Sequence, residues 1–260
     1  MPSASDNPAR RRLESMEDIE FTKALVFCPH PDDAEFALGG SLAKWTSEGK
    51  ECIVCVVTNG AGGSNDPKAD RDWLITTREE EQRKAAAITG VSEVIFLGYE
   101  DDYVEDSHEL RRDMIREIRR HKPDLVIGPD PTTWYFADRY INHPDHRKVG
   151  EAFLAAAYPG SETLPIYREE LYDKGFEPHK PSNVLLSFST QPDYFVDISD
   201  HISQKIEAIL AHTSQMENMD ATERVPNQVK ELGRFIAGAG GIEGDFAEGF
   251  KAFRFRKPQD

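Results

Sequence analysis

Short continuous runs of apolar residues alternate along the chain with longer segments in which apolar residues recur every three or four positions. The runs cover residues 24–28, 53–58, 94–97 and 125–127, with a further one at 184–188. A short run of consecutive apolar residues is typical of a parallel strand that is buried on both faces. We therefore expect each run to be a strand of one central sheet.

The segments between the first four runs carry helix signals. Thr76 or Thr77, each followed three residues later by a glutamate, has the pattern of a capped helix start, and Gly90 is a suitable helix end. A second helix is expected to start at Asp106 and Glu109 and to end in a basic cluster, where the helix dipole favours cations.

The second half of the chain is less regular. The segment after His146 reads as a helix that ends at Pro159, and residues 160–182 are expected to form a long surface excursion. Residues 202–216 read as one amphipathic helix. The glycines between 233 and 244 predict an irregular C-terminal segment.

Repeated strand-helix-strand order predicts an α/β fold, a Rossmann-like three-layer sandwich with a mostly parallel central sheet. A chain of 260 residues is compatible with a single domain, which we place at residues 19–260, after a disordered tail at 1–18. In such folds the functional site lies beyond the carboxyl ends of the strands.

The net charge restricts the classes of binding partner, and the cysteine content indicates the cellular compartment. A formal net charge of -16 argues against nucleic-acid binding and against anionic membranes, and there is no apolar run near the roughly 20 residues that span a bilayer. The three cysteines are too few for a disulfide scaffold and suit a reducing cytoplasm. Cys52 and Cys55 lie three apart in a predicted strand, so their side chains should point to opposite faces.

Two similar strings carry the candidate chemistry, His-Pro-Asp-Asp at residues 30–33 and His-Pro-Asp-His at residues 143–146. A catalytic zinc takes three protein ligands of the His/Asp type and keeps one position open. His30, Asp33 and His146 would be such a set. Either string alone is also a reasonable loop or helix cap, but the pair in an alternating α/β chain favours a hydrolytic metal site.

The remaining polar residues of the two strings would then be free for acid-base work. One carboxylate of an adjacent Asp pair can bind a metal while its neighbour reaches a water, which assigns proton transfer to Asp32. His143, three residues before His146, would face the substrate and stabilise a developing charge.

Several blocks together resemble the LmbE-like, or PIG-L, family of zinc deacetylases. The resemblance spans roughly residues 22 to 255 and rests on residues 29–35 with Gly39-Gly40, 58–60, 78–99 and 143–146. Residues 196–198, Lys205 and 212–215 resemble the C-terminal block of the bacillithiol and N-acetylglucosamine branch.

The resemblance implies a role for each matching residue. It implies that His30, Asp33 and His146 bind one Zn²⁺ per chain and that Asp32 is the general base. It also implies that His143 stabilises the oxyanion or protonates the amine.

The same resemblance extends to positions around this centre. Asp145 would hold the His143 imidazole in one orientation, and Arg78 and Asp101 would contact the sugar. His212 either lines the pocket or is a core histidine. The relatives also imply a homo-oligomer, a hexamer or a trimer.

The leading functional hypothesis is a cytoplasmic zinc-dependent hydrolase that removes the acetyl group from an N-acetylglucosaminyl compound. The partner would be a small amino sugar such as N-acetylglucosamine, a chitooligosaccharide or a thiol glycoside. A zinc amidase that cleaves a larger amide, such as a thiol conjugate, is the first alternative. A non-catalytic metal-binding protein on the same fold is the second.

Overall fold

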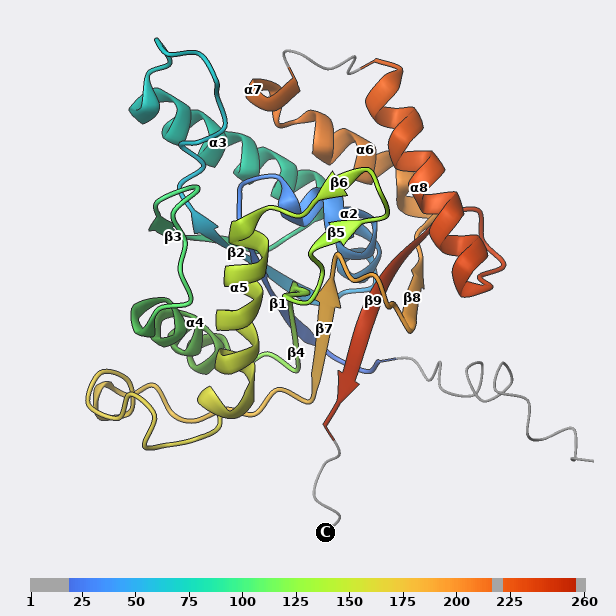
Figure 1. Ribbon diagram of the computed structural model, residues 1–260. Helices are drawn as coiled ribbons and strands as arrows, with labels where there is room; N and C mark the ends of the chain where they lie inside the picture. Colours follow the sequence, from blue (N-terminus) through green and yellow to red (C-terminus); the bar gives the residue numbers. More distant parts are fainter. Residues whose placement is uncertain (1–18, 217–221, 256–260) are drawn as a thin grey trace, which may run out of the picture.

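The computed structural model describes residues 19–216 and 222–255, so the predicted tail at 1–18 lies outside the described residues. A seven-stranded sheet forms its centre, in the order β3-β2-β1-β4-β7-β9-β8 (Figure 1). The strands are β1 (Lys23–Cys28), β2 (Glu51–Thr58), β3 (Glu93–Tyr99), β4 (Leu125–Pro129), β7 (Asn183–Ser187), β8 (Tyr194–Asp197) and β9 (Ala247–Arg254).

The sheet is mostly parallel. β1 pairs in parallel with β2 and β4, β2 with β3, and β4 with β7, whereas β9 runs antiparallel to both β7 and β8. Alternate residues of each strand face opposite sides, so Cys52 packs in the core on one face and Cys55 in the core on the other. The predicted strands and the predicted opposite placement of these cysteines are confirmed.

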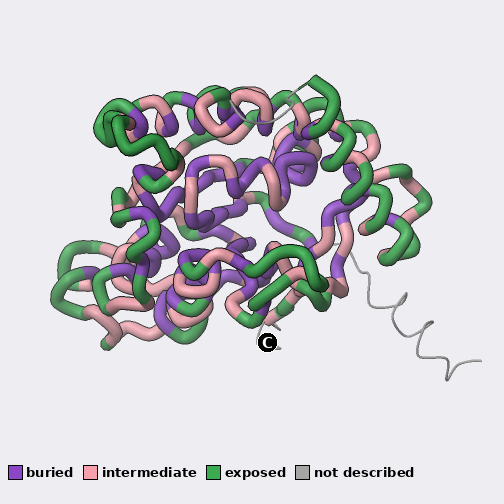
Figure 2. The backbone as a smooth tube through the Cα atoms, turned by 45° about the horizontal axis from the view of Figure 1, so that its top comes forward, coloured by how far each residue is buried: buried purple, intermediate pink, exposed green. Residues whose placement is uncertain are grey.

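Helices cover both faces of the sheet and complete the expected three layers (Figure 1). One face packs against α2 (Asp33–Ser47), α6 (Ile202–Leu210) and α8 (Arg224–Gly240), with α3 (Arg71–Thr89) against α2 and α6. The other face packs against α4 (His108–His121) and α5 (Pro144–Ala155). Figure 2 shows the buried backbone concentrated in the central layer and the exposed backbone in the outer segments.

Two predicted helix starts were wrong. α3 begins at Arg71, because the Asp70 carboxylate accepts hydrogen bonds from the amides of Asp72 and Trp73 and caps the helix there. α4 begins at His108 because the Ser107 hydroxyl accepts from the Leu110 amide. In both helices, the side chain that accepts hydrogen bonds from the free amides of the first turn sets the start, and it is not the residue that the sequence pattern indicated.

The C-terminal part is more regular than predicted. Residues 224–240 form α8 despite its glycines, because Val225, Val229 and Ala237 are spaced to bury one face of a helix. Strand β9 follows it, where no strand was predicted. The helix predicted over 202–216 is interrupted after Leu210, and α7 (Thr213–Met216) resumes after His212.

Close packing of α5 on β4 brings the second His-Pro-Asp string to the strand ends. A Cβ on Gly150 would lie 2.6 Å from the Pro129 carbonyl oxygen, and one on Gly128 would lie 2.4 Å from the ring of Phe153. Both distances are shorter than real Cβ contacts, so only glycine permits this approach.

The remaining described segments lie at the surface. A small hairpin of β5 (Tyr135–Phe136) and β6 (Tyr140–Ile141) precedes α5, and residues 160–182 form turns, as predicted for a surface excursion. Among residues 19–216 and 222–255, no helix combines the length and the apolar content needed to cross a bilayer.

Candidate active site

The two His-Pro-Asp strings meet beyond the carboxyl ends of the parallel strands. His30 lies two residues after β1, and Asp33 is the first residue of α2. His146 lies in the first turn of α5, whose packing on β4 places it beside them. The fold thus assembles the residues at the edge where α/β proteins bind ligands.

His30, Asp33 and His146 form a compact donor set. Asp33 lies between the two imidazoles, with Oδ2 3.1 Å from His30 Nδ1 and Oδ1 3.2 Å from His146 Nε2. One ligand atom from each residue lies within 4.8 Å of the others. Zinc-ligand bonds of about 2.0–2.1 Å in a tetrahedron place the ligand atoms about 3.3 Å apart, so this set fits a metal ion.

Two further carboxylates surround His30. Its Nε2 lies 3.0 Å from Asp101 Oδ1 and 3.2 Å from Asp145 Oδ2. Asp101 follows β3, and Asp145 precedes His146 in α5. Three buried or nearly buried carboxylates thus contact a single imidazole, which leaves a local excess of negative charge.

This excess of negative charge changes the pKa values of His30 and Asp33. Burial alone would lower the pKa of His30, but its hydrogen bonds with Asp101, Asp145 and Asp33 outweigh burial and raise the pKa well above its ordinary value. Burial alone would raise the pKa of Asp33, but His146 and His30 hold it well below its usual range. A proton on His30 therefore neutralises part of the negative charge of the three carboxylates, which a bound divalent cation would otherwise neutralise.

Two buried polar atoms of the same cluster have no hydrogen-bond partner. Asp145 Oδ1 and His146 Nδ1 are both enclosed and unpaired among the described residues. An unpaired buried polar atom is costly, and a bound ion or water is one of the explanations for it.

Asp32 points to the cavity beside the donor set and is not part of it. Its φ of 116° lies in the left-handed region, which is strained for a residue other than glycine and is characteristic of functional sites. Its amide donates to Gln82 Oε1 at 3.0 Å, and Arg78 Nη2 lies 3.3 Å from its Oδ2. Burial raises the pKa of Asp32 to about 6, against the lowering effect of Arg78.

His143 lies on the other side of the donor set, and its ring centroid is 4.9 Å from that of His30. The Asp145 backbone amide donates to His143 Nδ1 at 3.2 Å, which leaves the proton of a neutral ring on Nε2. Nε2 lies 3.0 Å from Asp102 Oδ1. The Asp145 backbone amide therefore contacts the His143 ring, but its carboxylate does not orient that ring as expected. The carboxylate next to the His143 ring belongs to Asp102.

The three residues expected to bind substrate are buried. Arg78 is 4% exposed and donates to the carbonyls of Gly60 and Pro31, at 2.9 and 2.7 Å. Asp101 is 5% exposed and accepts from the Gly62 amide at 2.9 Å. Both stand directly behind the donor set and Asp32.

His212 is fully buried and faces Glu35, with Nε2 3.2 Å from Glu35 Oε2. Its burial alone would lower its pKa, but the hydrogen bond to Glu35 outweighs this and raises it. Glu35 also accepts from Gln82, which connects this pair to Asp32.

Sequence reasoning missed four residues of the site, Glu35, Gln82, Asp102 and Asn142. Glu35 and Asn142 lie beside the two strings in the sequence but were assigned no role, whereas Gln82 and Asp102 reach the site through tertiary contacts. Asn142 lines the cavity with a buried Oδ1 that has no partner, while its Nδ2 donates to the Thr133 carbonyl.

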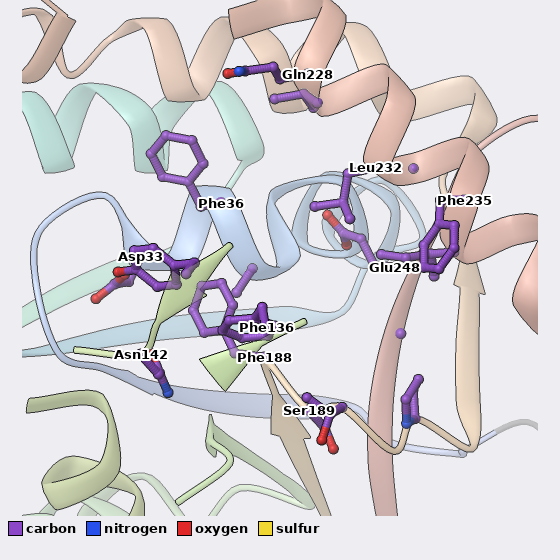
Figure 3. A pocket seen from close by; sticks show the side chains of 18 of the residues that line it. Asp33, Phe36, Phe136, Asn142, Phe188, Ser189, Gln228, Leu232, Phe235 and Glu248 are labelled. Carbon is purple, nitrogen blue, oxygen red and sulfur yellow. The ribbon is translucent and has the colours of Figure 1, made fainter. Parts of the chain in front are cut away.

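A groove of 1220 Å³ opens over the donor set (Figure 3). Its wall includes Asp32, Asp33 and His143 at one end and residues of α8 at the other. In Figure 3, Asp33 and Asn142 lie on one side of the view, Phe136 and Phe188 in the middle, and Leu232 and Phe235 on the other side. Arg78, Asp101 and His212 do not line it.

The parallel sheet carries at its edge a His/Asp donor set with a carboxylate and an imidazole beside it, an arrangement suited to hydrolysis. Residues 25–157 match the model of the family described as PIG-L: GlcNAc-PI de-N-acetylase. The chain belongs to this family of LmbE-like deacetylases and is an N-deacetylase, an amide hydrolase.

Three relatives illustrate the range of the similarity. Diacetylchitobiose deacetylase of Thermococcus kodakarensis is 33% identical over 202 residues, 78% of this chain and 72% of the relative. Mycothiol S-conjugate amidase of Streptomyces coelicolor is 25% identical over 256 residues, 78% of this chain and 85% of the relative. The structure of N,N'-diacetylchitobiose deacetylase from Pyrococcus horikoshii superposes with a TM-score of 0.81 at 27% identity, over 96% of this chain and 94% of that one.

Proposed function

We propose that this chain is a zinc-dependent deacetylase of a small N-acetylglucosaminyl compound. The observation that carries the proposal is a two-histidine, one-aspartate donor set with the Asp32 carboxylate and the His143 imidazole beside it. The named activity of the two diacetylchitobiose deacetylases supports the sugar part of the proposal.

His30, Asp33 and His146 would hold the metal. A bound zinc ion supplies Lewis acidity, which polarises an amide carbonyl and lowers the pKa of water. Two histidines and one carboxylate are a ligand set of catalytic zinc sites, in which a fourth position stays open.

Asp32 would act as the general base, taking a proton from water at Oδ2 or Oδ1. Its raised pKa, about 6, makes it a stronger base than an ordinary carboxylate while leaving it mostly ionised at neutral pH. Gln82 and Arg78 hold its backbone and side chain in place.

His143 would donate from Nε2 to the oxyanion that forms when water adds to the amide. The Asp145 amide fixes its tautomer, and Asp102 Oδ1 holds Nε2 until substrate arrives. The amine that leaves must also gain a proton, and the proton that Asp32 takes from the water would supply it.

Substrate contacts follow from which polar atoms face the groove. Asn142 lines the groove and its buried Oδ1 has no partner among the described residues, so it would accept a hydrogen bond from the sugar or from the amide N–H. Arg78, Asp101 and His212 would support binding indirectly, because each is buried behind Asp32, His30 or Glu35.

Two further features of the proposal concern assembly and location. We propose a homo-oligomer, which light scattering on the purified protein would test. A reducing, cytoplasmic location is supported by three buried free thiols.

One experiment tests the function as a whole. Purified protein, stripped of metal and reloaded with zinc, is assayed for acetate release from N-acetylglucosamine, diacetylchitobiose and a thiol glycoside of N-acetylglucosamine. We expect hydrolysis of at least one of them only with metal present. Absence of acetate release from all three, with one zinc bound per chain, would contradict the proposal and leave the amidase and the non-catalytic metal-binding protein as the two alternatives.

The amidase alternative has one specific observation in its favour. The chain is similar to a mycothiol S-conjugate amidase over most of both lengths. Cleavage of a thiol conjugate without acetate release from any N-acetylglucosaminide would support that alternative.

A further inference from the structure

The groove is larger than removal of an acetyl group requires. Its volume of 1220 Å³ exceeds the roughly 300–1,000 Å³ of typical small-molecule sites. It extends from Asp33 past Phe188 to Leu232 and Phe235 of α8 (Figure 3). The part beyond the donor set, which we call the apolar arm, lies between the 188–195 segment, Ile198, β9 and α8.

The apolar wall begins directly at the metal-binding residues. The Phe188 ring packs against the His146 imidazole, with centroids 5.3 Å apart. Phe36, one helical turn after Asp33, also lines the groove. The group that continues from the donor set into the arm therefore meets aromatic rings first, and the hydroxyl and amide side chains of the arm (Ser189, Thr190 and Gln228) are few beside its apolar residues.

Phe188 is held in place by a strained backbone. Its φ of 52° lies in the left-handed region, which a bulky aromatic residue rarely adopts. Strain of this kind persists only where the surroundings impose it, and it clusters at ligand sites. It directs the ring to the junction between the donor set and the arm.

α8 supplies the far wall. Val225, Val229, Leu232 and Ile236 recur at helical spacing and all line the groove. The one ion pair that lines the arm among the described residues, Lys205 with Glu248, is 2.5 Å apart and self-neutralising. The arm thus offers an apolar surface with no net charge.

We propose that the apolar arm binds an N-acyl chain longer than acetyl, so that the enzyme also removes medium-length acyl groups from an amino sugar. This inference rests on the proposed function, because it assumes that the amide carbonyl lies at the donor set. Of the two substituents of that amide, only the acyl chain is bonded directly to the carbonyl carbon and can enter the arm without the sugar ring.

The reaction balances as an ordinary hydrolysis. The oxygen of one water forms a bond to the acyl carbon, and the C–N bond breaks. The products are a carboxylate, which lies in the arm, and the protonated amine of the sugar, which receives the protons that the water loses.

A chain-length series tests the proposal. Glucosamine carrying N-acetyl, N-butanoyl, N-hexanoyl or N-octanoyl is incubated with the zinc-loaded enzyme, and the released amine is quantified. Full burial of one methylene is worth about a fourfold gain in binding. Because Leu232 is 55% exposed and the arm is open on one side, we expect about twofold per methylene, or about 60-fold in kcat/KM over the six methylenes from acetyl to octanoyl.

A matched pair of variants locates the effect. Leu232→Gln places an amide in the arm, whereas Glu231→Gln places the same amide at the neighbouring position, which does not line the groove. We expect Leu232→Gln to lower the octanoyl-to-acetyl ratio of kcat/KM about tenfold and Glu231→Gln to leave it unchanged.

Each other outcome overturns the proposal in an identifiable way. Acetyl hydrolysis with slower or no cleavage of longer chains contradicts the acyl-binding arm while leaving the proposed function intact. No hydrolysis of any member contradicts the acyl-binding arm, and it contradicts the proposed function only if diacetylchitobiose and the thiol glycoside are also left uncleaved. Faster deacetylation of octyl N-acetylglucosaminide than of N-acetylglucosamine, without an N-acyl preference, assigns the arm to an aglycone. Loss of an oligomer in Leu232→Gln, with an unchanged chain-length profile, assigns this face to a second copy of the chain.

Discussion

Two buried polar clusters lie on the same groove and differ in how completely their atoms are paired. The lysine–glutamate cluster consists of Ser41, Lys205 and Glu248. Glu248 accepts from the Gly40 and Ser41 amides, from the Ser41 hydroxyl and from Lys205, whose ammonium also donates to the Phe36 carbonyl. No side-chain atom of this cluster is left unpaired among the described residues.

The ligand cluster, by contrast, consists of His30, Asp33, Asp101, Asp145 and His146. It contains three carboxylates around one imidazole and two buried atoms without a partner. The difference teaches how to separate structural from functional buried charge. A cluster that completes itself stabilises the fold, whereas one with excess carboxylates and unpaired atoms requires a ligand from outside.

The largest expected effect tests whether Asp32 belongs to catalysis and not to the ligand cluster. Asp32→Asn removes the proposed base and keeps the shape of the side chain. We expect kcat to fall about 10²- to 10⁴-fold while zinc content stays at one per chain. Activity within threefold of wild type, measured on the best acetylated substrate, would contradict the assignment.

The lysine–glutamate cluster should respond in stability and not in metal binding. Glu248→Gln leaves Lys205 buried without its counter-charge, which costs about 3–5 kcal/mol of unfolding free energy. Replacing both partners, as Lys205→Met with Glu248→Gln, removes both charges while the Gln Oε1 can still accept from the Gly40 or Ser41 amide, so it should restore most of the loss. Urea titrations of both variants measure this, and a double variant as unstable as Glu248→Gln would show that the charges themselves are required.

Within the ligand cluster, replacing a buried carboxylate by its amide should change the free energy of unfolding only slightly. Asp145→Asn relieves the excess charge around His30 and keeps a hydrogen-bonding side chain, so the metal-free protein should change in unfolding free energy by less than about 1 kcal/mol. A loss as large as that of Glu248→Gln would remove the contrast between the clusters.

Asp102 tests the positioning of His143 with a smaller expected effect. Its side chain is 54% exposed, so solvent weakens its interaction with Nε2. We expect Asp102→Asn to lower kcat about 3- to 10-fold with KM nearly unchanged. A rise in KM at constant kcat would instead indicate that Asp102 contacts the sugar.

A similarly small effect is expected in a third polar cluster, far from the site and open to solvent. Asp124 accepts from the amides of Thr22 and Lys23 and from the Thr22 hydroxyl. Burial alone would raise the pKa of Asp124, but these hydrogen bonds lower it overall. Asp124→Asn should cost about 1 kcal/mol at neutral pH.

The sign of the pH dependence follows from that lowered pKa. The carboxylate stabilises the folded protein above its unfolded pKa of about 3.9, and this contribution is lost as pH falls through the lower folded value. The difference in unfolding free energy between wild type and Asp124→Asn should therefore shrink below about pH 4. A difference that grows in acid would contradict the assignment.

Much of the fold could be predicted because its signals are local. Buried strands such as 24–28 are continuous apolar runs, and the strings at 30–33 and 143–146 follow strand ends within a few residues. α8 was not predicted, because its glycines concealed an apolar stripe at Val225, Val229 and Ile236 that helical spacing would have revealed. Asp102 and Gln82 carry no local signal, since only tertiary packing brings them to His143 and Asp32.

The central claim is that the two adjacent aspartates have separate roles, Asp33 as a metal ligand and Asp32 as a base. Calorimetric titration of chelator-treated protein with zinc tests it without relying on activity. We predict one ion per chain for wild type and for Asp32→Asn with similar affinity, and at least about 100-fold weaker binding for Asp33→Asn. Retained binding in Asp33→Asn together with loss in Asp32→Asn, or no binding to the wild-type chain, would contradict the account.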